Sequence, residues 1–223
     1  MSPTSPSLSH PRVVPLGEAA FTVELGVGVD LSLHRRVLVL AARLRETLGA
    51  RALEIVPTYA AVGVYFDPRR DTFAALAPTA EELARRVVAE EAPPPPRGRL
   101  WEIPARYDGC DLASVAAAAR LCAAEVVAIH SSATYTVCFL GFAPGFAYLG
   151  QLDERLVLPR RPAPRKRIEP GTIAIAGRQT AIYPLPTAGG WHLLGRTDLK
   201  LFDPNREPAA LLAPGDTVRF LPS

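Results

Sequence analysis

The sequence lacks the features that mark membrane, secreted and disulfide-linked proteins. No run of about 18 apolar residues occurs, so we expect no membrane span. The first residues, MSPTSPSLSHP, have no basic segment followed by an apolar one, and we expect no signal peptide. The three cysteines, Cys110, Cys122 and Cys138, are an odd number without a CxxC spacing. The sequence therefore predicts reduced, buried cysteines in a cytoplasmic protein.

The usual signatures of a self-contained enzyme are also missing. There is no GxxxxGK[ST] phosphate loop, no GxGxxG after a strand and no GxSxG nucleophile turn. The four histidines show no metal-ligand spacing, so no metal site is expected. Met1 is the only methionine, which excludes a Met-Lys-Met biotin acceptor in this chain. A net charge of +3, from 25 basic and 22 acidic residues, is too small to indicate binding to nucleic acid.

What is present indicates two domains. Serine and proline dominate residues 1–11, which predicts a disordered tail. Four consecutive prolines lie in EEAPPPPRGR and cannot occupy a helix or a central strand. We therefore place a Pro-rich linker at residues 92–99, between an N-terminal domain at 12–91 and a C-terminal domain at 100–223.

The N-terminal domain alternates strand and helix patterns in the order β-β-α-β-β-α. AAFTVEL alternates apolar and polar residues, as a half-buried strand does. Apolar residues then recur at helical spacing, with Asp30 or Ser32 as the N-cap and Gly49 at the end. Thr79 and Glu82 match a capping box ahead of a second helix. These patterns predict a four-stranded sheet with two helices on one face.

The C-terminal domain has helices first and then mostly strands. LWEIPARY alternates as a strand, Asp111 can cap a helix, and AEVVAIHSS indicates a second, short helix. From Thr134 onward the segments TYTVCFL, TIAIAG, TAIYPL, WHLLGRT and DTVRF read as strands between Pro/Gly turns. This spacing favours a compact β-barrel or sandwich, and the whole chain is of the α+β class.

His130 is the candidate catalytic residue. It ends the second short helix of the C-terminal domain. A helix C-terminus stabilises a protonated imidazole, so His130 could act as an acid or base near neutral pH. The alternative is a histidine that caps carbonyl groups and packs its ring.

Two later segments carry candidate binding residues. PRRPAPRKR, residues 159–167, stiffens its cations with prolines, and Arg165 and Arg167 could hold a carboxylate or a phosphate. A solvated basic loop is the alternative. In AGRQTAIYPLPTAGGWHLLGRT, glycines allow a ligand to approach the backbone closely. The side chains there that suit a planar amide or carboxylate ligand are Gln179, Thr180, Tyr183, Trp191, Arg196 and Thr197. For Trp191, a core anchor is the alternative.

Residues 141–197 resemble the allophanate hydrolase subunit 1 / KipI family. The matching blocks, in one order, are GFxPGFxYLG, PR, IAGxQT, IYP, GGW and GRT. The sequence departs from the family at four places. Arg178 stands where a small residue is common. Gln151 and Ala181 each replace a glycine, and residues 187–188 replace a Ser-Pro pair. Ala181 would be strained if its position requires a positive φ.

The resemblance implies a fold, an activity and partners. The fold would be a small N-terminal α/β sandwich followed by a cyclophilin-like β-barrel. The activity would be that of the 5-oxoprolinase B subunit in this family, which takes part in the ATP-dependent opening of 5-oxoproline to glutamate. Its partners would be a paired KipA-like subunit (allophanate hydrolase subunit 2) and a 5-oxoprolinase A subunit. ATP would bind with a partner, and this chain would be inactive alone. The family leaves two alternatives, a KipI-like inhibitor of a sporulation histidine kinase and the carboxyltransferase half of a urea-carboxylase system.

The GFAPGFAYLG segment combines aromatic residues with turn formers. Its glycines and proline would hold a fixed, turn-rich shape. Phe142, Phe146 and Tyr148 would then fill the barrel core or line a pocket at the interface with the partner subunit, together with Trp191.

Overall fold

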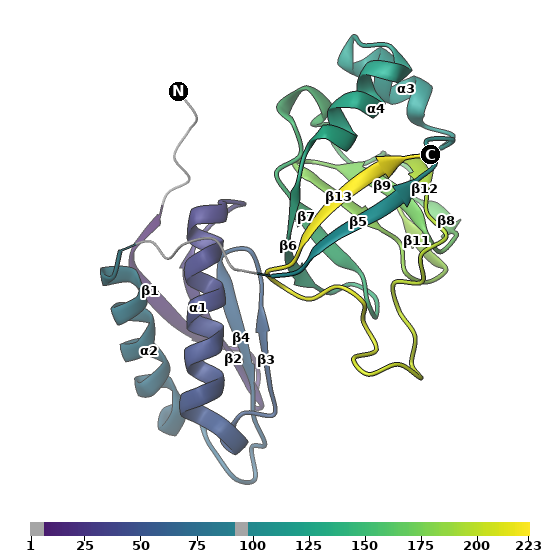
Figure 1. Ribbon diagram of the computed structural model, residues 1–223. Coiled ribbons are helices and arrows are strands. Elements are labelled where there is room, and N and C mark those ends of the chain that lie inside the picture. The colour runs from purple at the N-terminus through teal and green to yellow at the C-terminus, as the bar shows by residue number, and fades with distance from the viewer. Residues whose placement is uncertain (1–6, 92–97) are drawn as a thin grey trace. The chain divides into compact units, whose positions relative to one another are not determined.

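The chain forms two compact units, Met1–Pro96 and Arg97–Ser223 (Figure 1). The computed structural model describes residues 7–91 and 98–223. Most of the predicted Pro-rich linker, residues 92–97, lies outside the described part of the chain.

The N-terminal unit is an antiparallel four-stranded sheet with two helices. Its strands lie in the order β1-β2-β4-β3, and the predicted element order β-β-α-β-β-α is confirmed. One core joins apolar side chains of both helices to the sheet, among them Phe21, Leu40 and Leu76. Both helices therefore cover the same face, as Figure 1 shows. The elements are β1 (Ser7–Pro15), β2 (Ala20–Gly26), α1 (Leu31–Leu48), β3 (Glu54–Pro57), β4 (Ala61–Tyr65) and α2 (Phe73–Ala89).

Two boundaries of this unit differ from the sequence prediction. Residues 7–11, assigned to a disordered tail, belong to β1, which pairs with β2 from Ser7 onward. Residues 1–6 of that tail lie outside the described residues. Helix α2 begins at Phe73 with Thr72 as its N-cap, so Thr79 and Glu82 lie inside the helix. Pro78 also lies inside α2, after five helical residues that begin at Phe73.

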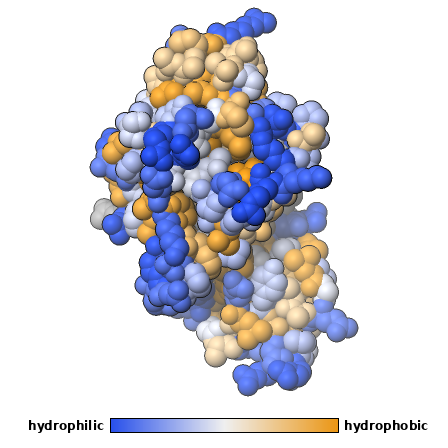
Figure 2. Space-filling model, turned by 90° about the vertical axis from the view of Figure 1, so that its right-hand side faces the viewer, coloured by the Kyte–Doolittle hydropathy of each residue, from blue (hydrophilic) through white to orange (hydrophobic). Residues whose placement is uncertain are grey.

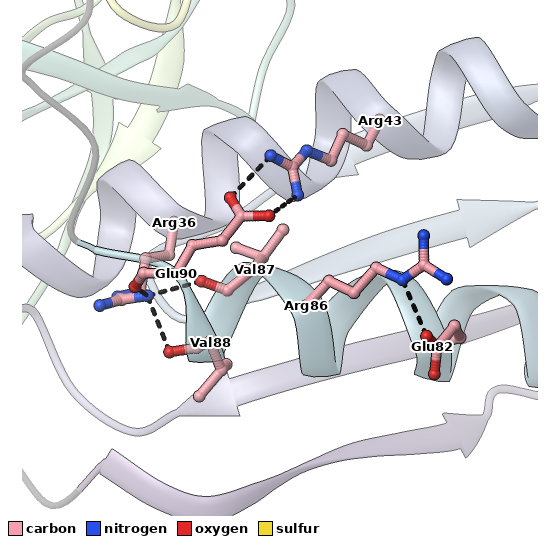
Figure 3. Close-up of polar contacts among 7 residues, drawn as sticks. All are labelled: Arg36, Arg43, Glu82, Arg86, Val87, Val88 and Glu90. Carbon is pink, nitrogen blue, oxygen red and sulfur yellow. Dashed lines mark hydrogen bonds and ion pairs between the residues drawn. The ribbon is translucent and has the colours of Figure 1, made fainter.

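The helix ends are capped by side chains from within the unit. Asp30, and not Ser32, is the N-cap of α1, and its carboxylate accepts from the backbone N–H groups of Ser32 and Leu33. Gly49 follows the last residue of α1 with a positive φ, as predicted. At the end of α2, Arg36 from α1 donates through Nη1 to the backbone carbonyls of Val87, Val88 and Glu90 (Figure 3). These carbonyls have no partner inside the helix, so Arg36 completes their hydrogen bonding.

The C-terminal unit is built on a seven-stranded sheet in the order β12-β9-β10-β7-β6-β13-β5, beside a two-stranded β11-β8 ribbon. Its elements are β5 (Leu100–Ala105), α3 (Leu112–Ala119), α4 (Ala123–Ser132), β6 (Tyr135–Leu140), β7 (Ala147–Gly150), β8 (Arg165–Ile168), β9 (Thr172–Ala176), β10 (Gln179–Ile182), β11 (Thr187–Gly189), β12 (His192–Arg196) and β13 (Thr217–Pro222). Helices α3 and α4 lie together at one end of the unit (Figure 1).

The sheet nearly closes into a barrel. Its two edge strands meet just beyond β5, where Arg106 and Arg196 exchange two backbone hydrogen bonds of 2.9 and 2.8 Å. Gly195 allows this approach, because a Cβ there would collide with the carbonyl oxygen of Arg106. The predicted α+β class and the barrel are thus confirmed. The prediction missed strands β7, β8 and β11, which are short and rich in glycine or arginine.

Strands β9 and β10 are buried on both faces. On β9, Ile173 and Ile175 point into the main barrel core, whereas Ala174 and Ala176 contact a second cluster that contains Phe146. Alternate residues of a strand face opposite sides of a sheet, so the Ile-Ala-Ile-Ala pattern serves two cores. The small alanines leave room for aromatic rings on the second face.

In the described part of the chain, no single helix is long and apolar enough to span a membrane. Helices α3 and α4 pass that test only as a pair, by length and composition, and they are bent by 90° at the break between them.

Candidate functional site

An aromatic pocket of about 230 Å³ lies over the second cluster of the C-terminal unit. Its aromatic rings come from the β6–β7 hairpin and from the ends of β10 and β12. The basic segment, residues 159–167, follows η2 (Glu154–Leu156) and completes the wall. The lining residues are Phe142, Phe146, Tyr148, Arg160, Pro164, Tyr183, Ala188, Gly189, Gly190 and Trp191. Five predicted aromatic residues therefore come together in one pocket.

Phe146 is the centre of the aromatic arrangement. Its ring centroid lies 5.4 Å from that of Phe142, 5.0 Å from Tyr148, 5.2 Å from Tyr183 and 5.8 Å from Trp191. All four contacts are edge-on, which is a favourable geometry for aromatic pairs. The buried ring of Phe146 thus fixes the orientation of the four rings around it.

Phe142 differs from the other rings in exposure and backbone. It lies at the centre of a tight turn in which the N–H of Ala143 donates to the carbonyl of Gly141 at 2.9 Å. Its φ is +71°, a strained value for a residue with a side chain, and the residue is 63% exposed. Hydrophobic residues are scattered among hydrophilic ones on the face shown in Figure 2, and exposure alone is ordinary. Exposure together with strain at a pocket indicates a functional residue.

Tyr183 contributes a hydroxyl group to the pocket wall. Gly189 faces this hydroxyl so closely that a Cβ there would collide with it and with Ile168. Burial raises the pKa of Tyr183 to about 12. An ionised Tyr148 nearby would act in the same direction, and Arg160 and Arg165 act against this rise. The hydroxyl is therefore neutral at physiological pH and can both donate and accept.

The basic segment supplies cations to the pocket, although not through the residues that the sequence favoured. Arg160 is exposed and lines the pocket. Arg165 is mostly buried and donates to the carboxylate of Asp111 at 2.8 Å. Arg167 points to the surface, where it pairs with Glu169. Of the two predicted anion-binding arginines, Arg165 binds Asp111 and does not line the pocket, and Arg167 lies at the surface outside the pocket.

Asp111 has a different role from the predicted one. It precedes α3 as the N-cap residue, but its side chain makes no capping hydrogen bond. The carboxylate instead accepts from Arg161 Nη1 at 3.0 Å, Arg165 Nη2 at 2.8 Å and the N–H of Leu193 at 2.8 Å. Burial alone would raise the pKa of Asp111, but the bonds from Arg165 and Leu193 and the arginine charges outweigh it and lower the pKa.

His130 is fully buried, and the structure contradicts the expected charge. Its pKa is lowered to about 3 by burial, which outweighs any stabilisation by the helix end. The Thr180 hydroxyl donates to the carbonyl of Ala174 at 3.0 Å, so His130 Nε2–H donates to Thr180 Oγ1 at 2.9 Å. His130 Nδ1 then accepts from the Tyr107 hydroxyl at 2.7 Å. The geometry assigns the neutral Nε2–H tautomer, in which both ring nitrogens already have partners inside the barrel, and Thr180 is buried with His130.

Arg196 and Thr197 lie at the other end of β12 from Trp191. They line a separate depression of about 340 Å³ together with Arg106 and Asp198. Arg196 pairs with Asp108 and Arg106 pairs with Asp198, so each arginine of this depression already has an acidic partner. Gln179 lines neither the aromatic pocket nor this depression. Of the predicted binding residues, Tyr183 and Trp191 therefore line the aromatic pocket, whereas Arg196 and Thr197 line the separate depression.

The cysteines and the acidic residues form no metal-ligand cluster in the described part of the chain. Cys138 is buried as predicted, whereas Cys110 and Cys122 are exposed, and all three thiols are free. The prediction that all three are core residues is wrong for two of them. Within residues 7–91 and 98–223, no three His, Cys, Asp or Glu side chains cluster closely enough to hold a metal ion.

The departures from the family pattern differ in their consequences. Ala181 lies in β10, fully buried beneath the aromatic rings, and its φ is not positive. It therefore carries no backbone strain. Gln151, which also stands where the family has glycine, has a φ of +74°.

Sequence reasoning missed Arg160, Pro164 and Asp111 as parts of the site. Arg160 stood in a matching Pro-Arg block, so that signal was present. Asp111 gave no signal of its own, because a helix cap explained it. Its partners lie about 50 or 80 residues away along the chain, at Arg161, Arg165 and Leu193.

Comparison with known families places this architecture. Residues 11–212 match the model of the carboxyltransferase domain, subdomains C and D, and the chain belongs to that family. It is 42% identical to the B subunit of 5-oxoprolinase from Escherichia coli O157:H7, over 96% of this chain and 97% of that protein. This agrees with the resemblance inferred from residues 141–197.

Solved structures show the same fold. The crystal structure of TTHA0988 is 40% identical, with a TM-score of 0.79, over 92% of this chain. This chain spans only 40% of that protein. The urea amidolyase of K. lactis matches 99% of this chain at a TM-score of 0.77 and 19% identity, over 15% of its own length. That likeness concerns the fold alone.

Proposed function

We propose that this chain is the B subunit of an ATP-dependent 5-oxoprolinase, which opens 5-oxoproline to L-glutamate. The observation that carries the proposal is the aromatic pocket of about 230 Å³ with Arg160 in its wall. The 42% identity to the B subunit of a 5-oxoprolinase over nearly the whole chain supports the same assignment.

The pocket suits a small ring that bears a carboxylate. Pockets for drug-sized ligands have volumes of roughly 300–1,000 Å³, so this one favours a single small ring. The aromatic walls would contact the faces of the lactam ring, and Arg160 would pair with its carboxylate. The Tyr183 hydroxyl is placed to orient the ring amide.

ATP and further subunits are part of the proposal. The sequence has no phosphate-binding loop, and the aromatic pocket is small for a nucleotide. We therefore propose that ATP binds with a partner and that this chain is inactive alone. The partners would be a KipA-like paired subunit and a 5-oxoprolinase A subunit. Most of the TTHA0988 chain lies outside the match, as expected if a partner segment can be fused to this unit.

The chemistry requires activation of a stable lactam. Transfer of the γ-phosphoryl group of ATP to the lactam oxygen would form a C–O–P linkage and release ADP. Water would then add to the carbon, and the C–N bond would break to give the free amine and an acyl phosphate. A second water would hydrolyse the acyl phosphate, releasing phosphate and leaving the carboxylate of glutamate. Fixed cations and N–H donors stabilise the charge that develops on the oxygen. Arg160 would hold the substrate while groups from the partners complete the site.

The test is reconstitution. The chain is mixed with the paired subunit, the A subunit, 5-oxoproline and ATP, and glutamate is measured. We expect glutamate only when this chain is present. Arg160→Ala should lower kcat/KM by roughly 10- to 100-fold, because a charge-assisted hydrogen bond is lost. Arg178→Ala, which removes an exposed arginine paired with Glu154 outside the pocket, is the matched control. A well-formed complex that makes no glutamate would refute the proposal.

Carboxyl transfer is the second candidate. The match to the carboxyltransferase family model favours it. It would require a biotinylated partner, and the same complex tested with carboxybiotin would distinguish the two. No feature of the aromatic pocket specifically supports the other alternative, inhibition of a histidine kinase. A cytoplasmic location remains part of the proposal, and the free thiols of Cys110, Cys122 and Cys138 are consistent with it.

A further inference from the structure

Asp111 lies where three segments around the aromatic pocket meet. Its carboxylate is 5% exposed and accepts from Arg161, Arg165 and the backbone of Leu193. The arginines belong to the basic segment that forms one wall of the pocket. Leu193 is in β12, two residues after Trp191, which lies in another wall. A single carboxylate therefore connects two walls of the pocket.

Further hydrogen bonds connect the same two segments. The N–H of Arg161 donates to the carbonyl of Gly190 at 2.7 Å, and His192 Nε2 donates to the carbonyl of Pro159 at 2.9 Å. The N–H of Asp111 also donates to the carbonyl of Leu193 at 3.1 Å. Arg160 lies between the attachment points at Pro159 and Arg161, so its position depends on them.

The guanidinium groups of Arg161 and Arg165 have Asp111 as their acidic partner. Arg161 Nε and Arg165 Nη1 are buried and have no hydrogen-bond partner in the part of the chain that the structure describes. Two positive charges therefore share one carboxylate, and the cluster carries a net charge of +1 without Arg160. Without that carboxylate, two partly buried cations would repel each other at close range. The basic segment would then separate from β12.

We propose that Asp111 is a positioning residue of the aromatic pocket. It holds the basic segment against β12 and so places Arg160 in the pocket wall, where the proposed substrate carboxylate binds. The role in substrate binding rests on the proposed function, whereas the role in holding the segment does not.

The alternative role for Asp111 is purely electrostatic, and it predicts the opposite sign. A carboxylate beside an anion-binding site weakens the binding of anions. If Asp111 acted only through its charge, Asp111→Asn would strengthen the binding of 5-oxoproline. If it positions Arg160, the same variant weakens binding although the site becomes more positive.

The first measurement is hydrogen exchange of the full chain without substrate. In Asp111→Asn, we expect the amides of Arg161 and Leu193 to exchange about tenfold faster or more, while amides in the barrel core keep their protection. Arg161→Met, which leaves the bonds from Arg165 and Leu193 to Asp111, should give a smaller change in the same direction. Asp198→Asn, an exposed Asp-to-Asn change in the same unit, is the control. Unchanged exchange at Arg161 and Leu193 in a folded Asp111→Asn chain would overturn the inference.

The second measurement is kinetics in the reconstituted complex. We expect Asp111→Asn to raise KM for 5-oxoproline by about tenfold or more, with a smaller change in kcat, since misplacement of a binding group by about 1 Å can cost up to about 100-fold. A lower KM would identify the electrostatic role and overturn the positioning role. If the wild-type complex makes no glutamate, the proposed function fails, and hydrogen exchange still decides whether Asp111 holds the segment.

Discussion

At the scale of single residues, Phe142 and Gln151 share a backbone conformation but not a role. Both have a positive φ, +71° and +74°, and both are exposed. The side chain of Phe142 lines the aromatic pocket, whereas that of Gln151 does not. Strain that persists beside a pocket indicates function, whereas no pocket contact accounts for the strain at Gln151.

Replacement of Gln151 by glycine should stabilise the protein. A side chain at positive φ costs about 1–2 kcal/mol, and the greater freedom of glycine in the unfolded chain offsets part of the gain. We expect Gln151→Gly to raise the free energy of unfolding by about 0.5–1 kcal/mol, measured by urea denaturation. Gln151→Ala keeps the Cβ and should bring no such gain, and equal stability of the two variants would contradict the strain at this position.

Phe142 should show a division between stability and activity. Phe142→Gly and Phe142→Ala both remove the ring and its contact with Phe146. Only glycine relieves the backbone, so Phe142→Gly should be the more stable of the two by about 1 kcal/mol in thermal or urea unfolding. Glutamate formation by the reconstituted complex should fall in both variants. Full activity in either one would show that the exposed ring serves neither substrate nor partner.

Residue patterns alone identified the aromatic lining but not the electrostatics. Phe146, Tyr183 and Trp191 were recognisable, because turn formers beside aromatic residues are unusual in strands. The charge state of His130 was predicted from its place at a helix end. That prediction was wrong, because complete burial by neighbours from other strands lowers its pKa.

At the scale of elements, local signals predicted most helix ends. Asp30 and Gly49 bound α1 through their own backbone and side-chain chemistry. The start of α2 was misplaced by seven residues, since both Thr72 and Thr79 can cap a helix. Packing of Phe73 and Leu76 onto the sheet decides for the earlier start.

The end of α2 supplies a prediction about helix capping between elements. Arg36→Ala leaves the carbonyls of Val87 and Val88 without their donor in a partly buried place. We expect a loss of about 1–2 kcal/mol in the free energy of unfolding. Arg43→Ala, the control, removes an exposed bidentate pair with Glu90 (Figure 3) and should cost much less. Equal losses in the two variants would show that Arg36 acts as an ordinary surface charge.

At the scale of the whole molecule, the buried His130 couples global stability to pH. Its pKa is about 3 in the folded state, below its value of about 6.5 in the unfolded chain. On acidification the unfolded chain therefore binds this proton first, and stability falls as the pH drops from about 6.5 towards 3. The expected slope from this group is up to about 1.4 kcal/mol per pH unit.

The measurement is the urea midpoint between pH 7 and pH 5, in wild type and in His130→Gln. The variant keeps hydrogen-bonding groups but cannot titrate, so its overall stability is lower and its pH dependence is weaker. The same pH dependence in both proteins would show that His130 is not the group responsible.

The two compact units follow from the chain's own pattern, yet the pocket does not. The proline run indicated two units. Strand alternation and helical spacing indicated the element order of the N-terminal unit. The six candidate residues between Gln179 and Thr197 were placed in one site because they are close in sequence. Because β12 lies between them, Trp191, just before the strand, lines the aromatic pocket, whereas Arg196, at its end, lines the other depression.

The sequence by itself determined the family, the α+β class and the aromatic character of the site. These properties depend on residue types and on short spacings between residues, which can be read from the local sequence. Only the tertiary structure decided that Arg160, and not Arg167, lines the pocket, that His130 is neutral, and that Asp111 connects two pocket walls. Each of these results from burial or from contacts between distant segments, and neither is a property of the local sequence.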